Sequence, residues 1–149
     1  MSVLSVRRFA CVLALACAAA DVHAHDAATG EPADARKAGR VVNVTMSDTM
    51  RFDPAVITVK RGDTVRFVAR NAGKLKHEMV LGTKKELEEH AKHMREHPGM
   101  EHDESNALEV APGKTGEMGW RFTRAGTFYY GCLEPGHFEA GMVGKVVVK

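Results

Sequence analysis

The chain has 149 residues, with 21 lysines and arginines against 19 aspartates and glutamates and a net charge of +2 at pH 7. A chain of this length is expected to form one domain. The nearly balanced charge argues against nucleic acid or an anionic membrane surface as the main partner, because both attract strongly basic faces.

The N-terminal segment has the layout of a secretory signal peptide. Two adjacent arginines precede an apolar run over residues 9–20, and Val22-His23-Ala24 resembles a small-residue cleavage sequence. We therefore predict a signal peptide at residues 1–24 and a mature periplasmic protein that begins at His25. The apolar run is too short to span a bilayer, and no later segment is apolar enough, so we expect no membrane association after cleavage.

Two details of this segment stay open. Arg7-Arg8-Phe9 resembles a twin-arginine export signal, which is an alternative to the ordinary secretory route. Ala14-Leu15-Ala16-Cys17 resembles a degenerate lipoprotein box, which would place a lipid on Cys17 in place of cleavage after Ala24.

Cysteine usage narrows the chemistry. Cys11 and Cys17 fall in the predicted signal peptide, which leaves Cys132 alone in the mature chain and excludes a disulfide within it. An unpaired thiol in an oxidising compartment is either buried and inert, or it acts as a ligand or nucleophile.

The composition changes after the predicted cleavage site. Residues 25–40 are rich in Ala, Asp, Gly and Lys and lack large apolar side chains, which predicts a flexible arm. Short β-branched runs separated by turn residues then predict a folded domain over residues 41–149. The strands are predicted at residues 41–46, 56–60, 64–69, 77–81, 107–110, 115–122, 127–132 and 143–149. Seven or eight such strands predict an all-β fold, a β-sandwich with Greek-key connections.

One segment interrupts the strand pattern. Thr83-Lys84-Lys85-Glu86 is a capping box, and Pro98-Gly99 ends the element that follows it. Apolar residues recur between them at helical spacing, at Leu87, Ala91 and Met94. These signals predict one inserted helix over residues 84–96, within an insertion rich in His and Met at 83–105.

The sharpest chemical signal is a single loop between two predicted strands. It carries Cys132, His137 and Met142, and a second imidazole, His77, stands at the start of an earlier strand. Thiolate and thioether are soft ligands that suit copper, and a His2Cys set with a weak Met bond is the electron-transfer arrangement of blue copper. Zinc prefers four strong tetrahedral ligands, for which a thioether is a poor fourth.

The sequence resembles the cupredoxin, or type 1 blue-copper, family over roughly residues 41–149. The matching features are Phe52-Asp53-Pro54, Gly62-Asp63-Thr64-Val65, Asn71 ahead of His77, Pro112-Gly113, residues 126–130, the loop 132–142 and Gly144. The resemblance implies that His77, Cys132, His137 and Met142 hold one copper ion. The C-x4-H-x4-M loop is similar to that of rusticyanin-like bacterial proteins and longer than plastocyanin's.

A second, weaker constellation lies in the insertion. At 100° per residue, His90, His93, Met94 and His97 fall within a sector of about 100° of the predicted helix. Met100 and His102 follow in the polar loop, and imidazoles three or four residues apart can share one metal ion. The alternative is a solvated helix whose histidines contact only water, with Met94 packed inward beside Leu87.

The predicted mature N-terminus offers a third set of donors. If cleavage follows Ala24, His25 carries a free amine and an imidazole that can chelate Cu(II) together. The alternative is a frayed tail without a metal.

The sequence leaves two functions open, and we expect neither to be enzymatic. The first is periplasmic copper handling, as in bacterial cupredoxins linked to copper tolerance that the chain resembles. The second is one-electron transfer to a periplasmic redox protein. The loop lacks the second cysteine of a binuclear copper site, and the predicted mature chain lacks the His-x-His pairs of a multicopper oxidase. We expect a monomer.

Overall fold

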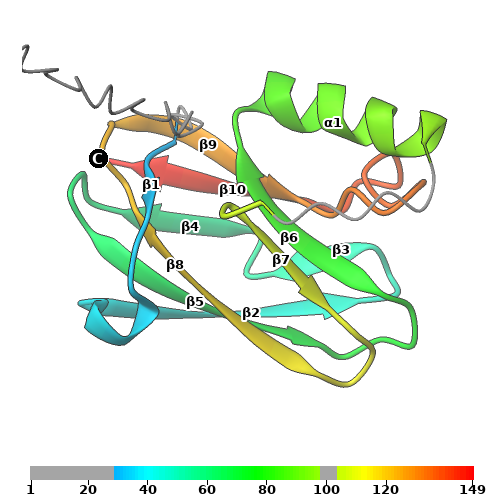
Figure 1. The fold of residues 1–149 in the computed structure, drawn as a ribbon, viewed down its shortest axis with the longest axis horizontal. Helices are drawn as coiled ribbons and strands as arrows, with labels where there is room; N and C mark the ends of the chain where they lie inside the picture. The colour runs from blue at the N-terminus through cyan, green and yellow to red at the C-terminus, as the bar shows by residue number, and fades with distance from the viewer. Residues whose placement is uncertain (1–28, 98–103) are drawn as a thin grey trace, which may run out of the picture.

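Two five-stranded sheets stack face to face in the computed structural model, which describes residues 29–97 and 104–149 (Figure 1). One sheet has the strand order β1-β8-β5-β2-β3 and the other β4-β10-β9-β6-β7. The strands are β1 (Glu31–Pro32), β2 (Arg40–Ser47), β3 (Arg51–Asp53), β4 (Val56–Val59), β5 (Thr64–Asn71), β6 (His77–Gly82), β7 (Ala107–Val110), β8 (Thr115–Arg121), β9 (Gly126–Gly131) and β10 (Val143–Val148). The predicted β-sandwich is confirmed.

The described residues form ten strands, two more than the upper number predicted. All eight predicted strands are present, and the additional ones are β1 and β3, of two and three residues. Two or three residues are too few for a periodicity argument, even in β3, where the buried Phe52 stands between the exposed Arg51 and Asp53.

The chain crosses between the two sheets several times. Strand β2 therefore pairs in parallel with β5, and β4 with β10, while the other neighbouring pairs are antiparallel. In the second sheet Val80 of β6 and Val143 of β10 both lie opposite Gly131, the last residue of β9. This register brings the start of β6, the end of β9 and the start of β10 to one end of the sandwich.

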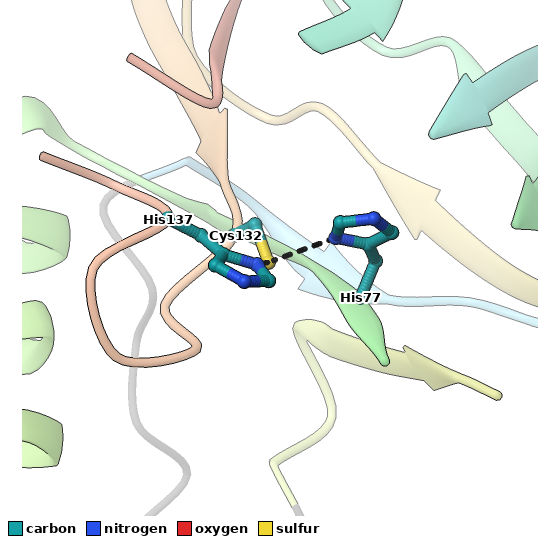
Figure 2. Close-up of side chains that lie close together, drawn as sticks. All are labelled: His77, Cys132 and His137. Carbon is teal, nitrogen blue, oxygen red and sulfur yellow. Dashed lines mark hydrogen bonds between the residues drawn. The ribbon is translucent and has the colours of Figure 1, made fainter. Parts of the chain in front are cut away.

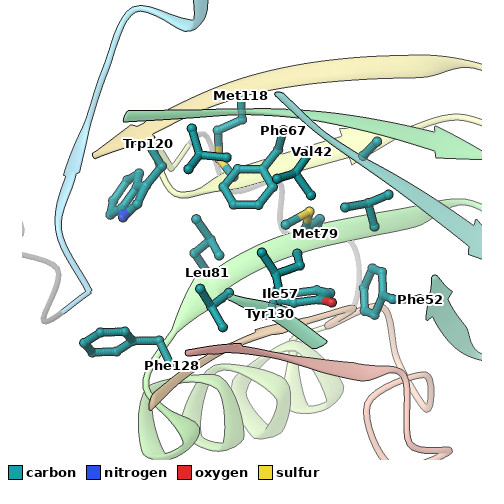
Figure 3. Packing of buried hydrophobic residues seen from close by; sticks show 14 of the residues in the cluster. Val42, Phe52, Ile57, Phe67, Met79, Leu81, Met118, Trp120, Phe128 and Tyr130 are labelled. Carbon is teal, nitrogen blue, oxygen red and sulfur yellow. The ribbon is translucent and has the colours of Figure 1, made fainter. Parts of the chain in front are cut away.

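The main core lies between the sheets (Figure 3). In β5 and β8 buried residues alternate with more exposed ones, as expected for strands with one face on a core. The largest fully buried core side chains include Trp120, Tyr130, Phe67 and Leu81. Burial of an aromatic or aliphatic side chain of this size stabilises the fold by about 1.5–3 kcal/mol each.

Helix α1 (Lys84–Glu96) has the bounds predicted from the capping box and from Pro98-Gly99. The Thr83 hydroxyl accepts a hydrogen bond from the Glu86 backbone N–H, and the Glu86 carboxylate accepts one from the Thr83 N–H at 2.7 Å. The helix buries Leu87, Ala91 and Met94 in a second apolar cluster with Val80 and Leu133. It therefore covers the outer face of β6 and β9 beside the loop after β9 (Figure 1). No helix in the described parts of the chain is long and apolar enough to cross a membrane.

The segment before β2 differs from the predicted flexible arm. From Thr29 onward it forms β1 and the 3₁₀ helix η1 (Ala35–Lys37), while residues 25–28 lie outside the described residues. Strand β1 pairs with β8, and Ala33 N–H donates to the Gly119 carbonyl at 3.0 Å. Because a Cβ on Gly119 would lie 2.1 Å from the Ala33 carbonyl oxygen, glycine allows this close approach. This part of the segment thus makes backbone contacts with β8, although it lacks large apolar residues.

Candidate metal centre

His77, the first residue of β6, is completely buried. Its Nδ1 lies 3.9 Å from the Cys132 Sγ, and its Nε2 lies 3.0 Å from Oδ1 of Asp48. The loop before it is held by Asn71, whose side-chain amide donates to the Leu75 and Val110 carbonyls at 2.8 and 2.9 Å. These bonds explain structurally why an asparagine precedes His77.

Residues 132–142 form a compact loop between β9 and β10. The His137 N–H donates to the Glu134 carbonyl at 2.9 Å, and the Met142 N–H donates to the His137 carbonyl at 3.0 Å. Gly136 has a φ of +86°, a left-handed conformation that favours glycine. The loop closes where the Cys132 N–H donates to the Met142 carbonyl at 3.1 Å.

This loop geometry brings His137 to the cysteine, with Nδ1 3.3 Å from Sγ (Figure 2). The ligand atoms of His77, Cys132 and His137 all lie within 4.8 Å of one another, and in the described residues no other such group of His, Cys, Asp or Glu is found. Donors that share one metal ion at bonds of about 2.0–2.3 Å lie roughly 3–4 Å apart. The three side chains are thus close enough to hold a single ion.

The donor types in this cluster suit copper. Two imidazoles and one thiolate are the trigonal set of an electron-transfer copper site, which a weak axial thioether completes. Met142 follows in the same loop, is fully buried and packs in the main core cluster with Cys132.

The protein environment changes the acidities of these groups. Burial raises the pKa of the Cys132 thiol to about 12 in the metal-free site, although a coordinated thiol is deprotonated outright. Burial, followed by the neighbouring His77, lowers the pKa of His137. A neutral His137 has a lone pair for a metal, so this shift favours ligation at neutral pH.

Two further residues contact the cluster. Neither was predicted from the sequence as part of the site. The Asp48 carboxylate meets His77, and it also accepts hydrogen bonds from the backbone N–H groups of Lys74 and Leu75 at 2.8 and 3.3 Å. Asp48 stands 29 residues before His77, and in the sequence it looks like an ordinary turn residue. No local signal links the two positions. The hydrogen bond from Lys74 is the main cause that keeps the pKa of Asp48 below its usual value; burial opposes this shift, and the hydrogen bonds from Leu75 and His77 reinforce it.

The second such residue is Glu78. Its side chain accepts a hydrogen bond from the Leu133 N–H at 2.8 Å, and its own backbone N–H donates to the Cys132 Sγ at 3.4 Å. Burial raises the pKa of Glu78 to about 7, partly opposed by the hydrogen bond from Leu133.

The structure keeps two of the four candidate copper donors of α1 together and directs the other two elsewhere. His93 and His97 are exposed, and their ring centroids lie 4.4 Å apart. His90 is partly buried, with Nδ1 3.9 Å from the Glu104 carboxylate. Met94 packs inward in one apolar cluster with Leu87. This inward position of Met94 is the one expected for a helix that binds no copper through Met94. The remaining predicted donors, His25, Met100 and His102, lie outside the described residues.

Comparison with curated proteins identifies close relatives. The chain is 61% identical over 132 residues to the copper-resistant cuproprotein CopI of Rubrivivax gelatinosus, covering 87% of this chain and 80% of that protein. It is 38% identical over 155 residues to the copper-resistant cuproprotein CopI of Pseudomonas aeruginosa, covering 85% of each.

Solved structures agree on the fold. Auracyanin B aligns with a TM-score of 0.65 at 21% identity, covering 83% of this chain and 96% of that one. Auracyanin A, a blue copper protein of Chloroflexus aurantiacus, aligns with a TM-score of 0.63 at 26% identity, covering 74% of this chain and all of the other.

The family model for copper-binding proteins of the plastocyanin/azurin family matches residues 39–149, which include both sheets from β2 onward, α1 and the whole His–Cys–His cluster. The copper-binding family agrees with the donor set for copper that His77, Cys132 and His137 form. The chain is therefore a cupredoxin, a member of the plastocyanin/azurin family of copper-binding proteins.

Proposed function

We propose that the protein is a periplasmic copper-handling protein with one redox-active type 1 copper ion. Nδ1 of His77, Sγ of Cys132 and Nδ1 of His137 would hold the ion, and the Met142 thioether would be a weaker fourth donor. The observation that carries this assignment is the convergence of the three ligand atoms within 4.8 Å of one another. Copper supplies a reversible one-electron couple, and the chain supplies the geometry that both oxidation states accept.

The role in copper tolerance is supported by the relatives. Two proteins that match most of this chain, at 61% and 38% identity, are both named copper-resistant cuproproteins. Export through the predicted signal peptide would place the protein where external copper first accumulates. The protein acts as a monomer without enzymatic activity in this role.

A second, weaker copper site on α1 would add capacity for excess metal. His93 and His97 are one helical turn apart, exposed and adjacent. His97 Nδ1 lies 3.2 Å from the His93 carbonyl, so it donates there and leaves Nε2 as the acceptor nitrogen. Both residues lie at the helix C-terminus, where the negative end of the helix dipole favours a cation.

A dedicated electron carrier is the second candidate function. The fold and the His–Cys–His cluster favour it as much as copper handling, since the same site would pass an electron to a periplasmic redox protein. The relatives named for copper resistance favour the first role.

Titration of the protein starting at His25 with Cu(II) tests the copper site. We expect an intense thiolate-to-copper absorption band that saturates at one equivalent and is missing in the Cys132→Ser variant. A folded wild-type protein without this band would refute the type 1 assignment.

Expression in a copper-sensitive bacterium that lacks its own tolerance protein separates the two roles. For copper handling, we expect the wild-type chain to restore growth on high copper and Cys132→Ser to restore less. Growth on high copper that is the same with and without the wild-type chain would favour the electron carrier.

A further inference from the structure

The imidazole of His77 is held from both sides. Nδ1 faces the Cys132 sulfur at 3.9 Å, and Nε2 faces Oδ1 of Asp48 at 3.0 Å. A neutral imidazole carries one proton, and the nitrogen without it is the one that can bind a metal. The partner of Nε2 therefore decides whether Nδ1 presents a lone pair to the cluster.

Asp48 is well placed to make that choice. A carboxylate without a proton only accepts hydrogen bonds, so its contact with His77 requires the proton on Nε2. The carboxylate is itself held by the N–H groups of Lys74 and Leu75, at 2.8 and 3.3 Å. These hydrogen bonds link the turn after β2, where Asp48 stands, to the loop that leads into β6.

The chain makes room for this carboxylate. A Cβ built on Gly73 would lie 1.9 Å from Oδ1 of Asp48. Gly73 does not have a positive φ, so its backbone would accept alanine, and only the space occupied by Asp48 opposes a side chain there. The Gly73 N–H also donates to Oδ1 of Asn71 at 2.9 Å, which fixes the loop against the carboxylate.

We infer that Asp48 is a positioning residue for the copper site: it fixes the Nε2–H tautomer of His77, directs Nδ1 to the metal and increases the donor strength of the imidazole. Metal-bound histidines commonly donate their other N–H to a carboxylate in this way. The inference rests on the proposed role of His77 as a ligand.

The charge of Asp48 has a second consequence. A negative charge close to the ligand stabilises Cu(II) more than Cu(I), because the interaction grows with the charge of the ion. Asp48 therefore lowers the reduction potential of the site and strengthens Cu(II) binding. A carboxylate that merely tied the two loops together would stabilise the fold without affecting either property.

Three variants separate these roles. Asp48→Ala removes both the acceptor and the charge, whereas Asp48→Asn keeps a neutral acceptor oxygen. Gly73→Ala leaves Asp48 in the sequence but displaces its carboxylate. The control is Asp63→Ala, since Asp63 accepts a backbone N–H from Lys60 at 2.9 Å in a turn without contact to the cluster.

The first measurement uses metal-free protein and long-range ¹H–¹⁵N correlation spectra of the His77 ring. We expect the Nε2–H tautomer in the wild type, Asp48→Asn and Asp63→Ala, and a shift toward Nδ1–H in Asp48→Ala and Gly73→Ala. This measurement does not depend on copper, so it tests Asp48 even if the type 1 assignment fails.

The second measurement uses the copper-loaded protein. Loss of such a carboxylate typically costs 10–100-fold in metal affinity. If the loss falls on Cu(II) and not on Cu(I), the reduction potential of Asp48→Ala rises by about 59 to about 118 mV. Asp48→Asn should raise the potential while keeping the tautomer. An unchanged tautomer and an unchanged reduction potential in both Asp48→Ala and Gly73→Ala would overturn the inference. If Asp48→Ala does not fold, an unchanged reduction potential in Asp48→Asn would overturn the effect of the charge.

Discussion

The backbone N–H of Glu78 donates a hydrogen bond to the Cys132 sulfur at 3.4 Å. The two residues stand 54 positions apart in the chain, on β6 and directly after β9. The Glu78 side chain lies on the face of β6 that α1 covers, and it accepts a hydrogen bond from the Leu133 N–H. Glu78 thus holds both the Cys132 sulfur and the backbone N–H of Leu133, the next residue of the copper loop. Hydrogen bonds to a ligand sulfur tune the reduction potential of a copper site.

Replacement of Glu78 should destabilise the metal-free protein through Leu133. In Glu78→Ala the buried Leu133 N–H loses its acceptor, which costs about 1–3 kcal/mol of unfolding free energy. Glu78→Gln keeps an acceptor oxygen and should lose less. Urea unfolding of both variants measures the difference. Equal losses would contradict a stabilising role for the acceptor oxygen at position 78.

Replacement of Met142 should change the copper site with little effect on the fold. Leucine has a similar volume and apolar character, so Met142→Leu should cost less than about 1.5 kcal/mol of stability. Loss of the thioether donor destabilises Cu(II) more than Cu(I), so the reduction potential should rise while the thiolate band remains. Met118→Leu, in a buried methionine on β8, is the matched control. A potential identical in both variants would exclude Met142 as a copper ligand.

Copper uptake beyond the type 1 site should depend on His93 and His97. The background for this test is His25→Ala with one equivalent of Cu(II) already bound, so that the thiolate band is saturated and the type 1 site is filled. Further Cu(II) should then give a second electron paramagnetic resonance signal with nitrogen couplings, and His93→Ala with His97→Ala should abolish that signal. His90→Ala is the control, because His90 lies on the same helix but beside Glu104, which stands after the helix. Equal uptake by all variants would contradict the site on α1.

A methyl group on Gly144 should disrupt the core beneath the copper loop. Its Cβ would lie 2.1 Å from Cζ of the buried Tyr130 ring, whose hydroxyl donates to the Pro54 carbonyl. Overpacking of this kind costs about 1–3 kcal/mol or more. Thermal unfolding should show the loss for Gly144→Ala, while Gly39→Ala, with no atom within 4 Å of its Cβ, should change little. Equal melting temperatures would show that Tyr130 moves aside at little cost.

Local patterns predicted much of the architecture. Alternating β-branched runs located eight strands, and the Thr83–Glu86 capping box and Pro98-Gly99 located the two ends of α1, because each signal lies within a few neighbouring residues. The contacts of Asp48 and Glu78 had no such signal, since both depend on the packing of distant loops. The strand β1 was missed because its contacts with β8 are made mainly by the backbone.

The sequence by itself determined which donors the chain offers and that three of them, Cys132, His137 and Met142, share one loop. Donors that share one loop need only hydrogen bonds within that loop to come together. Only the tertiary structure decided that His77 joins Cys132 and His137, that Asp48 meets its other nitrogen, and which histidines of α1 face outward. These relationships follow from strand register and from the packing of α1 on the sheet, which arise from contacts between residues far apart in the chain and leave no local pattern.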